Sequence, residues 1–195
     1  MAGSVARWRT VDIVVAAVIA VAFGVVFWAW NLVWNATGGA FGFFPPAQSL
    51  LYGVWLVPAV LAGLIIRKPG AAVFTETVAA VISALLGDKW GWTVIPQGAL
   101  EGLGAEIAFA VTFYRSFKLP VAALGGALAG LFATMFDAIV WYHGTSWATF
   151  RLPYVAFGVA SSLVIAGLGS VALVRALSGT GVLDRFPAGR ERAPV

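Results

Sequence analysis

The amino-acid sequence predicts an all-α membrane protein whose chain crosses the bilayer six times. Of the 195 residues, 61% are hydrophobic and only 10% are charged, and the mean hydropathy is +0.94. A soluble domain usually carries about 25% charged residues, and a small one has too little interior to hide so much apolar surface. Long apolar runs recur along the chain, and basic residues gather at alternate connections between them.

The apolar runs define the individual helices, because a spanning helix needs about 20 mostly apolar residues. The first run is too long for the core of a signal peptide and lacks a small-residue cleavage site, so we expect it to be retained. The helices together form one domain, residues 1–178, and the Gly-, Pro- and Arg-containing residues 179–195 are expected to be a flexible cytoplasmic tail. The predicted spans are residues 11–34, 47–66, 70–87, 97–117, 119–141 and 152–177.

The distribution of Lys and Arg predicts the orientation of the chain. One set of helix ends holds all of these residues except Lys89 and Arg151, which lie at the other set. Since basic residues favour the cytoplasmic side, both termini are expected in the cytoplasm. The residues assigned to the cytoplasmic ends are Arg7, Arg9, Arg67, Lys68, Arg115, Lys118, Arg175, Arg185, Arg190 and Arg192.

The composition also excludes several chemistries. The chain has no Cys and a single His, so neither a thiolate nor a His-cluster metal site is expected, and no cofactor is indicated. No phosphate-binding loop is present, so any ATP hydrolysis must come from a partner. The net charge of +4 comes from residues at helix ends. We read it as an orientation signal rather than as a nucleic-acid surface.

Small residues at four-residue spacing mark faces where helices can approach closely. In the first helix Ala16, Ala20 and Gly24 form such a stripe along one side. The stripe either packs inside the bundle or docks onto another membrane subunit, and its position near the cytoplasmic end makes it the better docking candidate. Other small-residue faces are formed by Gly98 with Gly102 and by Gly126 with Gly130.

Carboxylates within the predicted spans are candidates for function, because burying a charge in a bilayer is costly. The topology places Glu101 and Asp137 about one helical turn below the outer surface, Glu106 nearer the middle and Glu76 in the inner half. Glu101 and Glu106 are five residues apart and point about 140° away from each other. The alternative is that these carboxylates pair with other groups inside the bundle or are neutralised there.

Polar and aromatic residues gather in the outer halves of the last three helices. Gln97 shares a helix face with Glu101, and Trp141 shares one with Asp137. Such a site suits a flat, polar organic molecule, neutral or cationic, that stacks on rings and donates to carboxylates. The outer aromatic residues could instead form an interfacial belt, and His143 a solvated surface residue. The candidate substrate-binding residues are Glu101, Gln97, Asp137, Trp141, Tyr154, Trp34, Trp92, Glu106 and His143.

The opening stretch, residues 8–34 (WRTVDIVVAAVIAVAFGVVFWAWNLVW), resembles the YkoE-type substrate-binding (S) component of energy-coupling factor (ECF) transporters. The resemblance implies an S-component-like bundle in a bacterial cytoplasmic membrane that captures a vitamin from the outer side. It also implies a transmembrane coupling (T) subunit and two ATPase subunits or domains as partners. Thiamine or its hydroxymethylpyrimidine precursor is the implied substrate, and the stripe Ala16, Ala20 and Gly24 matches the family's motif for contact with the T subunit.

Two other functions are alternatives to an S component. An intramembrane enzyme would use the carboxylates as acid and base, but the sequence shows no nucleophile pattern or metal cluster. A stand-alone ion-coupled carrier would shuttle protons through Glu106 and Asp137, but the sequence shows no inverted repeat. Uptake by cells that lack the ATPase partner would separate such a carrier from an S component.

Overall fold

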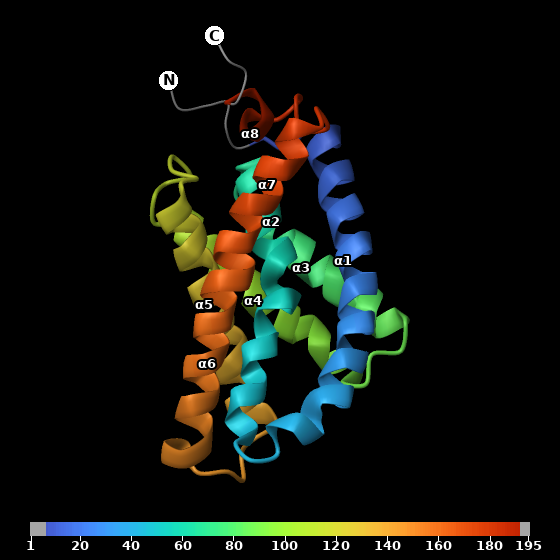
Figure 1. Cartoon of the computed structure of the whole chain (residues 1–195). Coiled ribbons are helices and arrows are strands. Elements are labelled where there is room, and N and C mark those ends of the chain that lie inside the picture. Colours follow the sequence, from blue (N-terminus) through green and yellow to red (C-terminus); the bar gives the residue numbers. More distant parts are fainter. Residues whose placement is uncertain (1–6, 192–195) are drawn as a thin grey trace.

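The described part of the chain, residues 7–191 of a computed structural model, is helical and contains no strand. Long helices run side by side along one axis, and α2 lies between α1 and the α6–α7 rod (Figure 1). The elements are α1 Thr10–Thr37, η1 Gly38–Phe41, η2 Pro45–Leu56, α2 Val57–Ile66, α3 Ala71–Leu85, η3 Gly91–Thr93, α4 Val94–Ala110, α5 Leu119–Val140, η4 Trp147–Arg151, α6 Leu152–Ser162, η5 Leu163–Leu168, α7 Gly169–Gly179 and α8 Pro187–Arg190.

Four helical stretches of the described chain are long and apolar enough to cross a bilayer: Thr10–Phe41, Pro45–Ile66, Leu119–Val140 and Trp147–Gly179. The α3 and α4 helices have 15 and 17 residues. At about 1.5 Å per residue they are shorter than the roughly 30 Å hydrocarbon core. The chain is thus an all-helical, multi-pass membrane protein, with α3 and α4 as its two short helices.

The start of α1 is fixed by charges at its first turn. The Asp12 carboxylate accepts a hydrogen bond of 2.7 Å from the backbone N–H of Arg9 and pairs with the Arg9 side chain at 2.9 Å. It also pairs at 2.5 Å with Lys68, which follows α2 in the sequence. An acidic residue is favoured near a helix N-terminus, so Asp12 both caps α1 and ties it to the connection before α3.

The α2 helix forms the centre of the bundle. Nine of its ten residues are buried, as expected for a helix that is apolar around its whole circumference. It continues from η2, a stretch of 3-10 helix, and Pro58 lies in its first turn. At this junction the backbone N–H of Ala59 donates to the carboxylate of Glu76 on α3, at 2.8 Å. Glu76 is therefore buried and links α3 to α2 through this hydrogen bond, and it does not face solvent.

Two helix boundaries differ from the sequence prediction. The fourth helix ends at Ala110 rather than near residue 117, because Phe113 and Tyr114 adopt left-handed backbone conformations, with φ of 53° and 55°. No Gly or Pro marks that turn in the sequence. The last helix begins at Trp147, before the predicted start at residue 152, with a π-helical turn that ends at Arg151.

Residues 179–191 are ordered against the bundle, which differs from the expected flexible tail. Leu183 and Phe186 are buried among residues of α1 and α2. Both carboxylate oxygens of Glu191 accept hydrogen bonds from the Arg67 guanidinium. This bonding holds the pKa of Glu191 below its ordinary value, and partial burial opposes the shift. Two apolar side chains thus anchor the segment; residues 192–195, including Arg192, lie outside the described part.

Glycine faces bring α3, α4, α5 and α6 together, as the spacing of these residues predicted. A Cβ added at Gly98 would lie 2.7 Å from the Ala80 Cβ on α3. One added at Gly102 would lie 2.7 Å from the Val73 Cα, so neither position has room for a side chain. Gly126 and Gly130 lie equally close to the segment around Ser162. These faces are internal packing surfaces.

The small-residue stripe of α1 also packs inside the bundle, which corrects its assignment as a docking face. Ala16 and Ala20 are fully buried, and a Cβ on Gly24 would lie 2.5 Å from the Ile82 Cβ on α3. The small side chains let α1 and α3 approach closely, and this close approach covers the stripe. The exposed side of α1 carries large apolar residues instead, among them Val18 and Val21.

This packing predicts the effect of Ala20→Trp. We expect the purified protein to unfold at a clearly lower temperature, because overpacking a filled core costs about 1–3 kcal/mol or more. Val18→Trp is the matched control, since Val18 is 63% exposed on the same helix and should tolerate the ring. Equal thermal stability of the two variants, with transport lost only in Ala20→Trp, would instead place Ala20 on a free surface.

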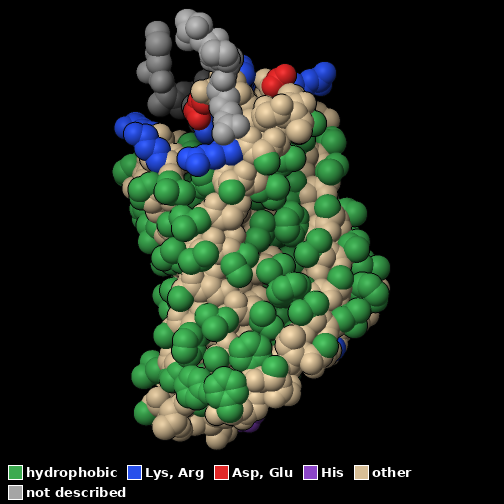
Figure 2. All heavy atoms as spheres, in the orientation of Figure 1, with side chains coloured by type: hydrophobic (Ala, Val, Ile, Leu, Met, Phe, Trp, Pro, Cys, Tyr) green, Lys and Arg blue, Asp and Glu red, His purple; other side chains and the backbone are tan. Residues whose placement is uncertain are grey.

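The two ends of the molecule differ in surface charge. Figure 2 shows Lys and Arg side chains gathered at the upper end, near α8, and hydrophobic side chains covering the flank below it. The starts of α1 and α8 lie at this same end (Figure 1). A basic end and an apolar flank are the surface that a membrane-spanning bundle requires.

Candidate functional site

The candidate site is a cavity between α1, η2, α3, α4 and α5 in the half of the bundle away from α8. Its open space is about 60 Å³. Typical ligand pockets measure about 300–1,000 Å³. A vitamin-sized molecule therefore requires the aromatic walls, or the loop of residues 86–93 that covers the cavity, to move apart. The lining residues are Phe27, Asn31, Trp34, Tyr52, Trp55, Ala80, Ser83, Asp88, Trp90, Val94, Gln97, Glu101 and Asp137.

Asp137 on α5 is the centre of a buried hydrogen-bond network. Its Oδ2 accepts from the hydroxyl of Tyr52 at 3.0 Å and from the hydroxyl of Tyr154 at 2.7 Å. Its Oδ1 lies 3.2 Å from the side-chain nitrogen of Gln97 on α4. The network joins η2, α4, α5 and α6, and it holds the Asp137 side chain in a fixed position on the cavity wall.

Glu101 is the carboxylate with the fewest partners at this site. The Gln97 amide nitrogen lies 3.1 Å from Glu101 Oε1, and it also reaches Tyr52 Oη at 2.6 Å and Asp137 Oδ1. An amide has two N–H hydrogens, so it cannot serve three acceptors fully. Within residues 7–191, Glu101 Oε2 accepts no hydrogen bond, although the residue is only 5% exposed. Glu101 therefore retains acceptor capacity for a ligand that enters the cavity.

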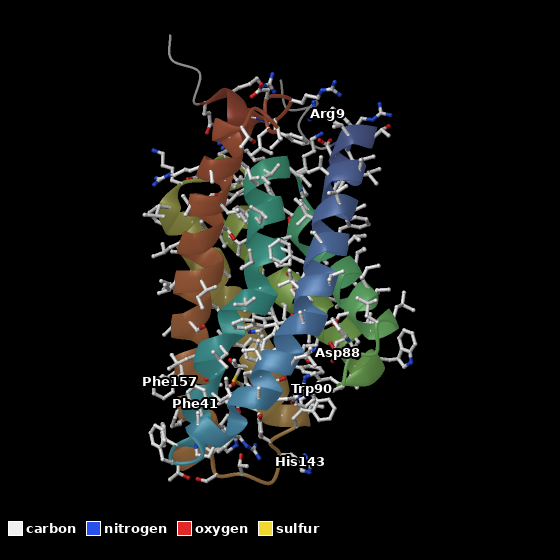
Figure 3. The ribbon with its side chains drawn as sticks, turned by 45° about the vertical axis from the view of Figure 1, so that its right-hand side comes forward. Arg9, Phe41, Asp88, Trp90, His143 and Phe157 are labelled. Carbon is white, nitrogen blue, oxygen red and sulfur yellow. The ribbon has the colours of Figure 1, made fainter. Side chains whose placement is uncertain are left out.

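Asp88 holds the loop that covers the cavity. Its Oδ2 accepts from Asn31 on α1 at 2.7 Å and from Ser83 on α3 at 2.6 Å. Its Oδ1 accepts from the backbone N–H of Trp90 at 2.9 Å. Asp88 and Trp90 lie together beside the lower half of α1 (Figure 3). Because its carboxylate is satisfied by the protein, Asp88 has the geometry of a loop anchor.

Aromatic rings form the rest of the cavity wall. Trp34, Tyr52 and Trp55 are in mutual contact, with ring centroids 5.3–6.2 Å apart. On the other side Trp90 lies 5.0 Å from Trp141. Such rings offer both apolar surface and a negative face that attracts cations.

The lining carries three carboxylates and no Lys or Arg. Lys89 lies nearby, with its ammonium 4.3 Å from the Trp90 ring centroid and a hydrogen bond to Asn35. Burial lowers the pKa of Lys89, and the Asp88 charge opposes that shift. Among the described residues, no group of three or more His, Asp or Glu side chains has the arrangement of a metal site. The electrostatics of the cavity therefore favour a cationic or hydrogen-bond-donating ligand.

The structure brings four of the nine predicted substrate residues to the cavity wall: Trp34, Gln97, Glu101 and Asp137. Two more act from behind it. Tyr154 bonds to Asp137, and Trp141 packs on Trp90. The indole nitrogen of Trp141 is buried without a hydrogen-bond partner among the described residues.

The other three predicted residues lie elsewhere. Trp92 is 65% exposed on the outside of the covering loop. His143 lies in an exposed connection at the lower tip of the molecule (Figure 3), where its backbone oxygen accepts from Arg151. Glu106 was expected near the middle of the bundle, but its carboxylate lies at the start of α3, at the basic end.

Glu106 is a helix cap. It accepts backbone hydrogen bonds from Gly70 at 2.7 Å and from Ala72 at 2.9 Å, and the Tyr114 hydroxyl donates to it at 2.7 Å. The first N–H groups of a helix have no partner within the helix, and an acidic group there also complements the helix dipole. Glu106 thus stabilises the start of a short helix and takes no part in the cavity.

We expect Glu106→Gln to lower the thermal stability of the protein by about 1 kcal/mol and to leave ligand affinity unchanged. The reason is that an amide is a weaker acceptor for the α3 N–H groups, and that the change lies far from the cavity. Thermal unfolding and calorimetric titration of one preparation measure both effects. A clear loss of affinity at full stability would return Glu106 to the list of ligand contacts.

Nine lining residues were missed from the sequence: Phe27, Asn31, Tyr52, Trp55, Ala80, Ser83, Asp88, Trp90 and Val94. A signal for three wall positions was present in α1. Phe27, Asn31 and Trp34 continue the face of Gly24 at helical spacing, so the small-residue stripe ends in a polar and aromatic patch. Tyr52 and Trp55 share the same type of spacing on η2.

Fold and cavity together define a membrane-embedded protein with a cavity whose lining suits a small polar or cationic molecule. Comparisons with known proteins agree. The family described as ABC-type cobalt transport system, permease component, matches residues 11–132. YkoE of Bacillus subtilis (strain 168), named as an HMP/thiamine permease protein, is 34% identical over 184 residues, which cover 94% of this chain and 92% of YkoE.

A crystal structure of an S-component of an ECF transporter superposes with a TM-score of 0.88 at 35% sequence identity, covering 95% of this chain and 93% of that one. The chain therefore belongs to the permease family that includes YkoE. It is an S component, the membrane-embedded substrate-binding subunit of an ECF importer, and not an enzyme.

Proposed function

We propose that this protein captures thiamine or its hydroxymethylpyrimidine precursor in the cavity between α1, η2, α3, α4 and α5. The observation that carries the proposal is the open acceptor capacity of Glu101 in a cavity lined by carboxylates and aromatic rings, with no Lys or Arg on its wall. The relative YkoE is named for the same two compounds.

The chemistry of the two partners is complementary. The exocyclic amine of the pyrimidine donates hydrogen bonds, and the Glu101 carboxylate accepts them. The thiazolium of thiamine carries a positive charge, which the Asp137 side of the cavity balances and the indole faces attract. Trp34 and Trp55 provide flat apolar surface for either ring of the vitamin.

We further propose that all six helical units cross the bilayer, with both termini in the cytoplasm. The short helices α3 and α4 would span by packing tightly on their neighbours, which the close contacts at Gly98 and Gly102 support. The basic end then faces the cytoplasm, in accord with the positive-inside rule, and the cavity lies toward the outer leaflet.

For transport, the proposal adds a transmembrane coupling subunit and two ATPase subunits or domains. The class of protein supports these partners, since an S component is one subunit of an ECF transporter. A stand-alone carrier that passes protons between Glu106 and Asp137 finds no support, because Glu106 caps α3 at the opposite end. Uptake that persists in cells without the ATPase partners would nevertheless favour the carrier.

The experiment that tests the substrate is calorimetric titration of the purified chain with thiamine, with hydroxymethylpyrimidine and with the pyrimidine analogue that lacks the amine. We expect saturable binding of at least one amino-bearing compound at micromolar concentration or below, and weaker binding of the analogue. Quenching of tryptophan fluorescence should accompany it, because several indoles line the cavity. No heat and no thermal stabilisation with any of the compounds would refute the substrate assignment.

A further inference from the structure

A second cavity lies at the basic end of the bundle, between α2, α5 and α7. Its volume is about 380 Å³, larger than that of the candidate substrate site. Three basic side chains, Arg67, Lys118 and Arg175, line it together with one carboxylate, Glu191. Its other walls include apolar residues such as Leu119 and Val174. Nothing in the proposed capture of a vitamin uses this cavity.

Arg67 is held in position on the cavity wall. Its Nε donates to the backbone oxygen of Leu64 at 3.1 Å, and its guanidinium carbon lies 4.8 Å from the ring centroid of Phe117. The two terminal nitrogens bind both oxygens of Glu191. Arg67 therefore binds the Glu191 carboxylate in a bidentate contact, the geometry that guanidinium groups use for carboxylates and phosphates.

Glu191 does not satisfy the positive charge of the cavity. Its side chain is 64% exposed, and an exposed ion pair contributes little stability, so another anion can displace it. Lys118 lies at the N-terminal end of α5, where the helix dipole adds positive potential. Within the described residues, the Lys118 ammonium donates no hydrogen bond to the protein. Arg67 and Lys118 thus face one displaceable carboxylate.

We propose that this cavity binds the head group of an anionic phospholipid. The phosphate would lie between Arg67, Lys118 and Arg175, and an acyl chain would follow the apolar wall formed by Leu119, Val171 and Val174. Basic pockets between membrane helices at the cytoplasmic surface are suited to anionic head groups. The cavity lies where α2 ends and α5 begins, and it combines positive charge with apolar surface as a lipid requires.

The test uses the purified full chain in a neutral detergent, with short-chain phosphatidylglycerol, short-chain phosphatidylcholine and inorganic phosphate as probes. Native mass spectrometry counts bound lipids, and thermal unfolding measures their affinity. We expect saturable binding of phosphatidylglycerol, clearly tighter than that of phosphatidylcholine. Lys118→Gln and Arg175→Gln should each weaken it by about five-fold, the effect of one basic residue near an anionic surface.

Arg185→Gln is the matched control, because Arg185 is exposed at the same end but does not line the cavity. It removes one charge and should leave the affinity unchanged. Equal affinity for the two lipids, or equal effects of all three variants, would overturn the proposal. Inorganic phosphate binding as tightly as phosphatidylglycerol would assign the cavity to a soluble anion. If Lys118→Gln or Arg175→Gln abolishes co-purification with the coupling subunit but leaves lipid binding intact, the cavity would be assigned to a protein partner. Either this result or tight binding of inorganic phosphate would contradict the proposal.

Discussion

Replacing Glu101 by Gln should weaken the binding of an amino-bearing pyrimidine by about 30-fold or more. Removing one member of a buried, charge-assisted hydrogen bond costs about 2–5 kcal/mol, and about 1.4 kcal/mol corresponds to a factor of ten. Glu101 is 5% exposed and retains an oxygen without a partner among the described residues, so no other acceptor replaces it at that point of the cavity. Calorimetric titration of the variant with thiamine measures the loss.

Two controls separate this effect from general damage. Glu106→Gln makes the same chemical change on the same helix but at the opposite end, and it should retain affinity. The pyrimidine analogue without the amine should bind the wild type and Glu101→Gln about equally, because it has no donor for the carboxylate to accept. If Glu101→Gln binds thiamine as tightly as the wild type does, another group of the cavity accepts the amine.

The sequence predicted the class of fold because membrane burial leaves a strong signal in composition. Apolar runs located each helical unit, and the basic residues divided the two ends. The same topology predicted that Glu101 and Asp137 lie in the same half of the bundle, and both line the cavity. These properties depend on counting and on helix periodicity, so they need no knowledge of which helices are neighbours.

The remaining predictions required contacts that no sequence pattern shows. Glu106 is an acidic residue in an apolar run, just like Glu101. Only the fold reveals that it meets the start of α3 while Glu101 meets a cavity. The stripe of Ala16, Ala20 and Gly24 was equally ambiguous, because a small-residue face suits both an internal neighbour and an external one. Leu183 and Phe186 were overlooked because they lie in a turn between α7 and α8, where no apolar periodicity marks a buried face.

Asp137 and Glu101 should respond differently when each carboxylate is replaced by an amide, because Asp137 has more partners within the protein. Its oxygens accept from two tyrosine hydroxyls and from the amide of Gln97, and these partners come from three different elements. An Asn at this position has one acceptor oxygen instead of two, and its NH₂ group would face groups that are themselves donors. A buried donor left without an acceptor costs about 1–3 kcal/mol.

We therefore expect Asp137→Asn to lower both the thermal stability and the ligand affinity, whereas Glu101→Gln lowers the affinity alone. Tyr154→Phe removes a single donor from the network and should cost only about 1 kcal/mol of stability. The loss of stability in the double variant Asp137→Asn with Tyr154→Phe should be smaller than the sum of the two single losses, because both changes disrupt one network. Strict additivity, or an Asp137→Asn protein as stable as the wild type, would mean that Asp137 contacts the ligand without organising the helices around it. Stability and affinity measured together on these variants thus distinguish the carboxylate that builds the cavity from the carboxylate that is left open to the ligand.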